Sequence, residues 1–189
     1  MKLIYLDTET TGLDKDKDDI IQLAGSIYAD GVTEEFNFLM RPREGYELSE
    51  GAYLAHKKTK EEIDQYPPSS EVFKQFMELL GKYVSKYDKK DKFMFVAYNA
   101  MFDMGFVRAW FDQNNEDYFH AWFHFPALDV MQAAAFHLIG KRHLMKNFQL
   151  STVYEEIIGK PIVNAHDALA DILATKEILN KIIESQRSF

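Results

Sequence analysis

The uninterrupted apolar stretch Phe93-Met94-Phe95-Val96-Ala97-Tyr98 decides the fold class, because a helical pattern over residues 101–111 follows it directly. Such a run is typical of a strand buried on both faces, which occurs where helices cover both sides of a sheet. A strand that leads at once into a helix predicts the crossover connection that joins parallel strands. The chain is therefore expected to contain a parallel part of a sheet with helices packed on it.

Three further strands are predicted before this unit. Residues 3–6 form a short apolar run that ends in acids, residues 20–28 are a second candidate, and residues 32–40 are a third after the turn at Asp30-Gly31. These three are expected to form an antiparallel meander, and residues 127–128 predict a last short strand. The fold class is therefore α/β, with a mixed five-stranded sheet of three antiparallel and then parallel strands, flanked by helices.

The predicted helices share apolar positions spaced three and four residues apart. They are expected over residues 49–55, 60–65, 70–87, 101–111, 130–139 and 165–184. No repeat, low-complexity tract or linker rich in Pro, Gly or Ser divides the sequence. Residues 1–189 are therefore expected to form a single domain.

The composition narrows the classes of partner and cofactor. The 22 basic and 30 acidic residues give a net charge of −8, which disfavours a long duplex and favours short or single-stranded nucleic acid. The chain has no cysteine, so oxygen or imidazole must hold any metal, which favours magnesium or manganese. The longest apolar runs fall far short of the ~20 residues that span a membrane. We expect a cytoplasmic protein with no membrane partner.

Asp7 and Glu9 are candidate metal ligands. They lie two residues apart at the end of the first predicted strand, so both side chains point to the same face. Neighbouring carboxylates repel each other, and a divalent cation between them removes that penalty. An Asp-x-Glu pair also occurs where a strand simply reaches solvent, so the pair alone is a weak signal.

Asp103 and Asp171 are both predicted to point inward from helices. Asp103 shares a stripe with Val107 and Trp110, and Asp171 lies among apolar positions of the helix at 165–184. A lone buried carboxylate is costly unless it is paired or binds a cation. The alternative for Asp103 is a favourable interaction of its charge with the helix N-terminus.

Two other side chains are candidates for roles beside the acids. His166 precedes Asp171 by about 500° of helical rotation, so it must sit at or before the helix start. There its pKa suits a general base for a metal-bound water, although a structural or solvated histidine is the alternative. Asn99, just before the helix at 101–111, is expected to cap that helix first and to contact substrate second.

Three motifs stand in order along the chain: Asp7-Thr8-Glu9-Thr10-Thr11-Gly12-Leu13, Tyr98-Asn99-Ala100-Met101-Phe102-Asp103, and His166 to Asp171. Their order and spacing resemble the motifs of the DEDDh exonucleases, the DnaQ-like family that includes the proofreading epsilon subunit of bacterial DNA polymerase III. The resemblance covers roughly residues 3–180. It departs from the family at Tyr98, where histidine is more frequent. The tyrosine-type subfamily would need tyrosine at the position of Asp167, so the histidine type fits.

The resemblance implies an RNase H-like fold in which four acids hold two divalent cations, Mg²⁺ or Mn²⁺: Asp7, Glu9, Asp103 and Asp171. It also implies that His166 activates the attacking water. Thr10, Gly12 and Leu13 would line the terminal nucleotide.

The expected activity is hydrolysis of single-stranded DNA from its 3′ end, with release of nucleoside 5′-monophosphates. DNA is the favoured substrate, RNA stays open, and a DNA polymerase is a further candidate partner. A replicative subunit and a free-standing enzyme both stay open, because nothing after the last helix resembles the polymerase-binding extension of proofreading subunits. The alternative from another class is a catalytically silent module of the same fold that binds nucleic acid or a polymerase.

Overall fold

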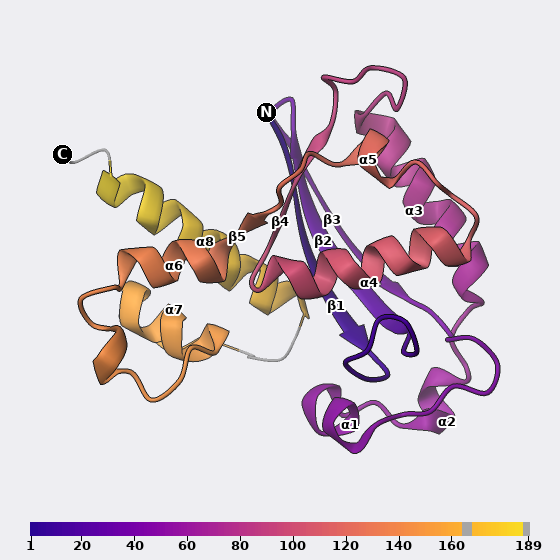
Figure 1. Ribbon diagram of the computed structural model, residues 1–189, viewed down its shortest axis with the longest axis horizontal. Helices are drawn as coiled ribbons and strands as arrows, with labels where there is room; N and C mark the ends of the chain where they lie inside the picture. Colours follow the sequence, from indigo (N-terminus) through magenta and orange to yellow (C-terminus); the bar gives the residue numbers. More distant parts are fainter. Residues whose placement is uncertain (164–167, 187–189) are drawn as a thin grey trace.

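The computed structural model describes residues 1–163 and 168–186, and it places a twisted sheet between two groups of helices (Figure 1). The strands are β1 Lys2–Thr10, β2 Ile20–Ala29, β3 Val32–Leu39, β4 Phe93–Ala97 and β5 Leu128–Asp129. The helices are α1 Glu50–His56, α2 Lys60–Ile63, α3 Ser69–Tyr83, α4 Ala100–Gln113, α5 Phe119–Trp122, α6 Val130–His137, η1 Arg142–Leu144, α7 Leu150–Ile158 and α8 Ala168–Gln186. Within the described ranges, no helix has both the length and the hydropathy needed to cross a membrane.

The predicted sheet is confirmed in strand number, order and direction. The five strands lie in the order β3-β2-β1-β4-β5, with β1 to β3 antiparallel and with β4 and β5 parallel to β1. Asp30 and Gly31 join β2 to β3 with φ angles of 53° and 82°. Positive φ at both central residues is the backbone of the two-residue turns that match the twist of a hairpin.

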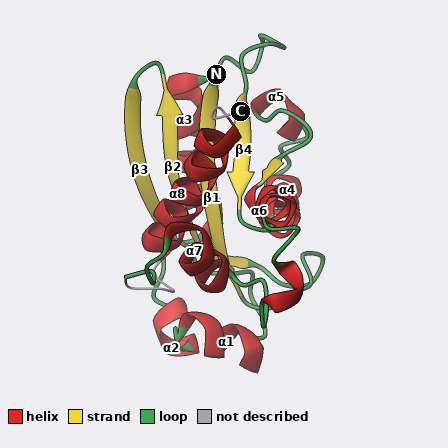
Figure 2. Cartoon of the chain, turned by 90° about the vertical axis from the view of Figure 1, so that its left-hand side faces the viewer, coloured by secondary structure: helices red, strands yellow, loops and turns green. Residues whose placement is uncertain are grey.

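The two faces of the sheet carry different helices. On one face, α3, α4 and α5 pack over Ile4 and Leu6 of β1; on the other, α6, α7 and α8 pack over Tyr5. Figure 2 shows β3, β2, β1 and β4 side by side behind α7 and α8. Because side chains alternate along a strand, Asp7 and Glu9 follow Tyr5 to the α8 side, whereas Thr8 follows Leu6 to the α4 side.

Several predicted boundaries are corrected. β1 continues to Thr10, so Asp7 and Glu9 lie within the strand and not at its end. α3 ends at Tyr83 and not at residue 87, because Val84 is extended and the Asp91 carboxylate accepts a hydrogen bond from the Ser85 amide. The helices α5 and α7 were not predicted. α8 is described from Ala168, and its predicted start at residue 165 lies outside the described residues.

Gly25 in β2 is the point where the sheet leaves no room for a side chain. It pairs with Leu6 of β1 and Phe36 of β3. A Cβ atom at this position would lie 2.2 Å from the Phe36 ring and 2.7 Å from the Tyr5 carbonyl oxygen. The Phe36 ring thus lies across Gly25 and packs against the Phe76 ring, with the two ring centroids 6.0 Å apart.

We expect Gly25→Ala to destabilise the protein by about 1–3 kcal/mol, because the added methyl group would force Phe36 or the β1 backbone to move. Urea unfolding followed by circular dichroism measures the change. Gly81→Ala is the matched control: Gly81 is exposed within α3 and a Cβ there meets nothing within 4 Å. The control should gain up to about 1 kcal/mol, because alanine favours a helix. Equal stability of the two variants would contradict this packing.

Candidate active site

The candidate site lies where β1 continues past the end of β4. β4 pairs with β1 only from Lys2 to Tyr5, whereas β1 stays paired with β2 as far as Thr10. After Ala97 the chain turns through Tyr98 and Asn99 into α4. Among the residues that the structure describes, no strand therefore pairs with residues 7–10 of β1 on that edge.

Asp103 occupies the open edge. The Thr8 amide donates a hydrogen bond of 2.9 Å to Asp103 Oδ1, and the Thr8 hydroxyl donates one of 2.8 Å to the same atom. Asp103 is only 4% exposed and shares the inner face of α4 with Phe106 and Val107. The predicted inward orientation is therefore present, and the carboxylate serves as the hydrogen-bond acceptor that a neighbouring strand would otherwise supply.

The four predicted acids are close enough to perturb one another. Burial raises the pKa of Asp7 well above its usual value, and the charges of Asp103, Glu9 and Asp171 raise that pKa further. Burial also raises the pKa of Asp103 to about 7, with Glu9 adding to the rise and the two Thr8 hydrogen bonds opposing it. The structure thus brings together acids from β1, α4 and α8.

The chemistry of this cluster fits hard divalent cations. All four side chains offer carboxylate oxygens, and their mutual repulsion is the energy that a cation would relieve. No group of three or more histidine or acidic side chains among residues 1–163 and 168–186 already has an arrangement that could hold a metal ion.

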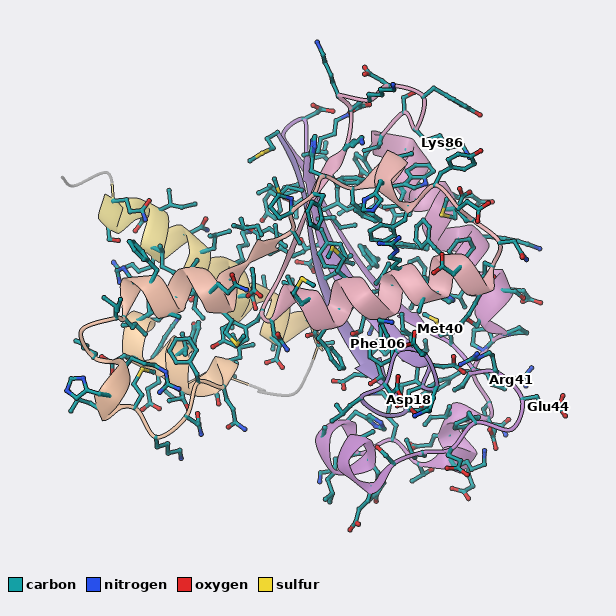
Figure 3. The ribbon with its side chains drawn as sticks, in the orientation of Figure 1. Asp18, Met40, Arg41, Glu44, Lys86 and Phe106 are labelled. Carbon is teal, nitrogen blue, oxygen red and sulfur yellow. The ribbon has the colours of Figure 1, made fainter. Side chains whose placement is uncertain are left out.

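The β1–β2 loop forms one wall beside the cluster. The buried Thr10 hydroxyl donates to the Gly12 carbonyl oxygen at 2.6 Å, and Asp18 lies so near Gly12 that a Cβ would be 2.3 Å from its Oδ2. Figure 3 shows Asp18 in this loop, beneath α4. Leu13 is 85% exposed. Thr10 and Gly12 therefore shape the loop, and Leu13 offers the apolar surface that a terminal base could contact.

Asn99 directly precedes α4, but the predicted capping hydrogen bond from its side chain is absent. Its backbone is left-handed, with φ 68° and ψ 51°, and its exposed side chain makes no capping hydrogen bond. Asparagine tolerates this conformation better than most residues, which explains its place in so tight a turn. The exposed side chain is consistent with the second predicted role, contact with substrate.

Asp129 was missed in the sequence, although it lies next to this turn. Its Oδ1 accepts hydrogen bonds from the amides of Asn99, Met131 and Gln132, at 3.3, 2.9 and 3.3 Å. Asp129 thus caps α6 and ties it to the turn before α4. An aspartate just before an apolar helical run is the signal that could have revealed this role.

The predicted general base, His166, and its neighbour Asp167 lie outside the described residues. The proposed role of His166 therefore stays a prediction from the sequence.

Comparison with known proteins identifies the family. The sequence pattern of the RNase T family, described as exonuclease, matches residues 4–179. The chain belongs to this exonuclease family. The predicted membership among DnaQ-like exonucleases is thereby confirmed.

Curated relatives of this exonuclease-family chain include polymerases. It is 28% identical over 182 residues to the PolC-type DNA polymerase III of Bacillus cereus, covering 96% of the chain and 11% of that protein. It is 26% identical over 186 residues to the PolC-type enzyme of Thermotoga petrophila, covering 97% and 12%. The chain thus spans only 11–12% of the length of these relatives.

Solved structures share the fold. The zinc-bound complex of E. coli ExoI with single-stranded DNA superposes with a TM-score of 0.78 at 21% identity, covering 99% of this chain and 41% of that one. E. coli exonuclease I with a dT13 oligonucleotide gives a TM-score of 0.77 at 21% identity, covering 99% and 42%. At this identity the likeness concerns the fold, and it confirms the predicted RNase H-like architecture.

The buried charge of Asp103 predicts an unusual dependence of stability on pH. Between the unfolded pKa of 3.8 and the folded pKa of about 7, the folded protein holds a proton that the unfolded chain has lost. The free energy of unfolding therefore falls as pH rises through this window. Asp103→Asn removes the charge but keeps an oxygen that accepts from Thr8.

In EDTA, we expect Asp103→Asn to be more stable than the parent at pH 8, by on the order of a few kcal/mol, with the difference shrinking towards pH 4.5. Urea unfolding at pH 4.5, 6 and 8 measures it. A variant no more stable than the parent at pH 8 would mean that the folded protein does not hold Asp103 in the costly state described above.

Proposed function

We propose that this protein is a 3′–5′ exonuclease that removes nucleoside 5′-monophosphates one at a time from the 3′ end of single-stranded DNA. The observation that supports it most is the cluster of Asp7, Glu9, Asp103 and Asp171 in a chain of the exonuclease family. Acids that are far apart in sequence and costly to gather are expected where they hold cations for catalysis.

The four carboxylates are proposed to hold two divalent cations, Mg²⁺ or Mn²⁺. When bound, these cations supply the positive charge that polarises the attacking water and stabilises the departing 3′ oxygen. The buried Asp103 is held by two hydrogen bonds from Thr8. Asp7 and Glu9 on β1 and Asp171 on α8 complete the set from the opposite face of the sheet.

The remaining residues are proposed to handle the proton and the terminal nucleotide. His166 takes a proton from the attacking water at an imidazole nitrogen. Leu13 packs against the last base, and Asn99 contacts the strand where it leaves the site. Thr10 and Gly12 hold the loop that presents Leu13.

DNA is favoured over RNA by the names of the related proteins. The curated relatives are DNA polymerases, and a structure of similar fold is an ExoI complex with single-stranded DNA. RNA stays open, as does a role beside a polymerase. The alternative, a catalytically silent binding module, gives no reason to gather four acids at a cost in stability.

A single-stranded DNA oligonucleotide labelled at its 5′ end should be shortened one nucleotide at a time in Mg²⁺ or Mn²⁺ and left intact in EDTA. Asp7→Asn should lower the rate by a factor on the order of 10³ or more, since a ligand is weakened. Glu44→Gln is the control, because Glu44 is an exposed acid on the segment beyond the far end of α4 (Figure 3). Parental activity in Asp7→Asn would refute the metal assignment, and silence of the parent in both cations would favour the binding module.

The base role of His166 is tested separately. His166→Ala should slow the reaction most near neutral pH, where imidazole accepts a proton, and should leave the Mn²⁺-dependent rise in melting temperature unchanged. Rates across pH 5.5–9 and melting curves with and without Mn²⁺ measure the two effects. A pH–rate profile identical to that of the parent would exclude this role.

A further inference from the structure

We propose that a basic, aromatic groove along the outer face of α4 binds the DNA strand on the 5′ side of the terminal nucleotide. This groove, called here the α4 groove, has a volume of about 770 Å³ and lies between α4 and residues 119–125. Among the side chains that line it are Lys15, Lys92, Met101, Met104, Arg108 and Phe125. The inference rests on the proposed exonuclease function and extends it to the recognition of a longer strand.

The groove follows from the two-faced character of α4. Met101, Met104 and Arg108 are spaced three and four residues apart, so they share one side of the helix. Asp103 and Val107 occupy the side that packs on the sheet. Met101 is 63% exposed and stands in the first turn of α4, as Asp103 does. The groove therefore begins at the same helical turn that brings the carboxylate to the candidate site.

Lys15 connects the β1–β2 loop with the groove. This loop carries Leu13, the proposed contact for the terminal base, and Lys15 follows two residues later. The stem of Lys15 crosses α4 at Gly105, where a Cβ would lie 3.2 Å from Lys15 Cδ. Glycine inside a helix costs about 1 kcal/mol relative to alanine. Here Gly105 makes room for the Lys15 side chain, which extends from the β1–β2 loop to α4.

The charges of the groove contrast with the net charge of −8. Arg108 is exposed and, in the described part of the chain, takes part in no ion pair or hydrogen bond of its side chain. Lys92 Nζ donates to the His120 carbonyl oxygen at 2.6 Å, a bond that leaves its charge without a carboxylate partner in that same part. Lys15 pairs with Asp16, whose side chain is exposed. Three positively charged side chains that can still bind phosphates thus gather in one groove of an acidic protein: Lys15, Lys92 and Arg108.

The apolar lining selects single-stranded nucleic acid among polyanions. Phe125 is 72% exposed beside the cations, and Met101 is exposed at the end nearest the candidate site. Alternating cations and exposed apolar or aromatic side chains suit a strand whose phosphates pair with Lys and Arg and whose unpaired bases stack. A duplex hides its bases and would leave this lining unused. The first turn of α4 carries both Met101 of the groove and Asp103 of the candidate site, and this proximity favours a DNA strand over an acidic peptide.

The test compares substrates that do and do not reach the groove. Two variants are compared with the parent: the single variant Arg108→Ala and a double variant that combines Lys92→Ala with Phe125→Ala. Each should raise KM for a 12-nucleotide single strand by about 3- to 10-fold and keep kcat within about twofold of the parental value. Cleavage of a dinucleotide should be unchanged, because only one nucleotide lies upstream of its terminal one. In Arg108→Ala, the slope of log KM against log salt concentration for the longer strand should fall by about one, which corresponds to the loss of one phosphate contact. Lys74→Ala, which removes an exposed lysine from α3, is the matched control.

The outcomes separate this proposal from the proposed function. If the parent cleaves the dinucleotide but the groove variants keep the parental KM for the 12-nucleotide strand, the groove assignment is overturned and the exonuclease is not. If the parent cleaves neither substrate, fluorescence anisotropy with a labelled 12-nucleotide strand still decides: affinity lost in Arg108→Glu supports the groove, and unchanged affinity overturns it. Groove variants that lose affinity for a labelled acidic peptide but keep the parental affinity for DNA would also overturn the proposal, in favour of a peptide site.

Discussion

The site depends on one constraint, which is that β4 stops pairing at Tyr5 while β1 continues to Thr10. The Thr8 amide beyond this point would be a buried donor without an acceptor, which costs about 1–3 kcal/mol. Asp103 supplies the acceptor for both the amide and the hydroxyl of Thr8. The parallel connection from β4 into α4 brings this carboxylate to the open edge, where it accepts both hydrogen bonds. Burial makes the charged form of Asp103 costly and raises the pKa of its carboxyl to about 7.

The repulsion between the acids then links folding to function. Two hydrogen bonds stabilise charged Asp103, yet burial and neighbouring carboxylates keep the pKa of both Asp103 and Asp7 above their ordinary values. Well-packed neutral side chains in these places would give a more stable protein. Retaining acids makes sense where positive charge arrives with a cation or substrate, because that charge converts the repulsion into binding energy. The instability of the cluster is thus the same property that makes it competent to bind cations.

The sequence predicted those parts of the structure that depend on local pattern. The apolar run before Tyr98 and the turn at Asp30-Gly31 are periodic or short-range signals, and the sheet they predicted is present. Contacts between distant residues were out of reach: the Thr8–Asp103 bonds join positions 95 residues apart. The early end of α3 depends on Asp91 binding the Ser85 amide, and the uncapped Asn99 depends on a tight turn beside Asp129. Helical spacing carries no information on either. The approach of α8, which brings Asp171 to Asp7, was inferred from motif order and not from packing.

An acidic chain can bind a polyanion if its cations act locally, because charges farther apart than about 8 Å are largely screened at physiological salt. The fold provides such a region next to the acids. Asp19 anchors the β1–β2 loop, since it accepts from Arg43 Nε at 2.8 Å and from Gln113 Nε2 of α4 at 3.1 Å. The loop is therefore bonded to α4 at Gln113, and the Lys15 stem lies against the same helix at Gly105. Because α4 carries Asp103 on one side and Arg108 on the other, the distance between a scissile bond and the upstream phosphates would be set by a rigid helix. Net charge then reports little about the ligand, and the local arrangement around α4 decides it.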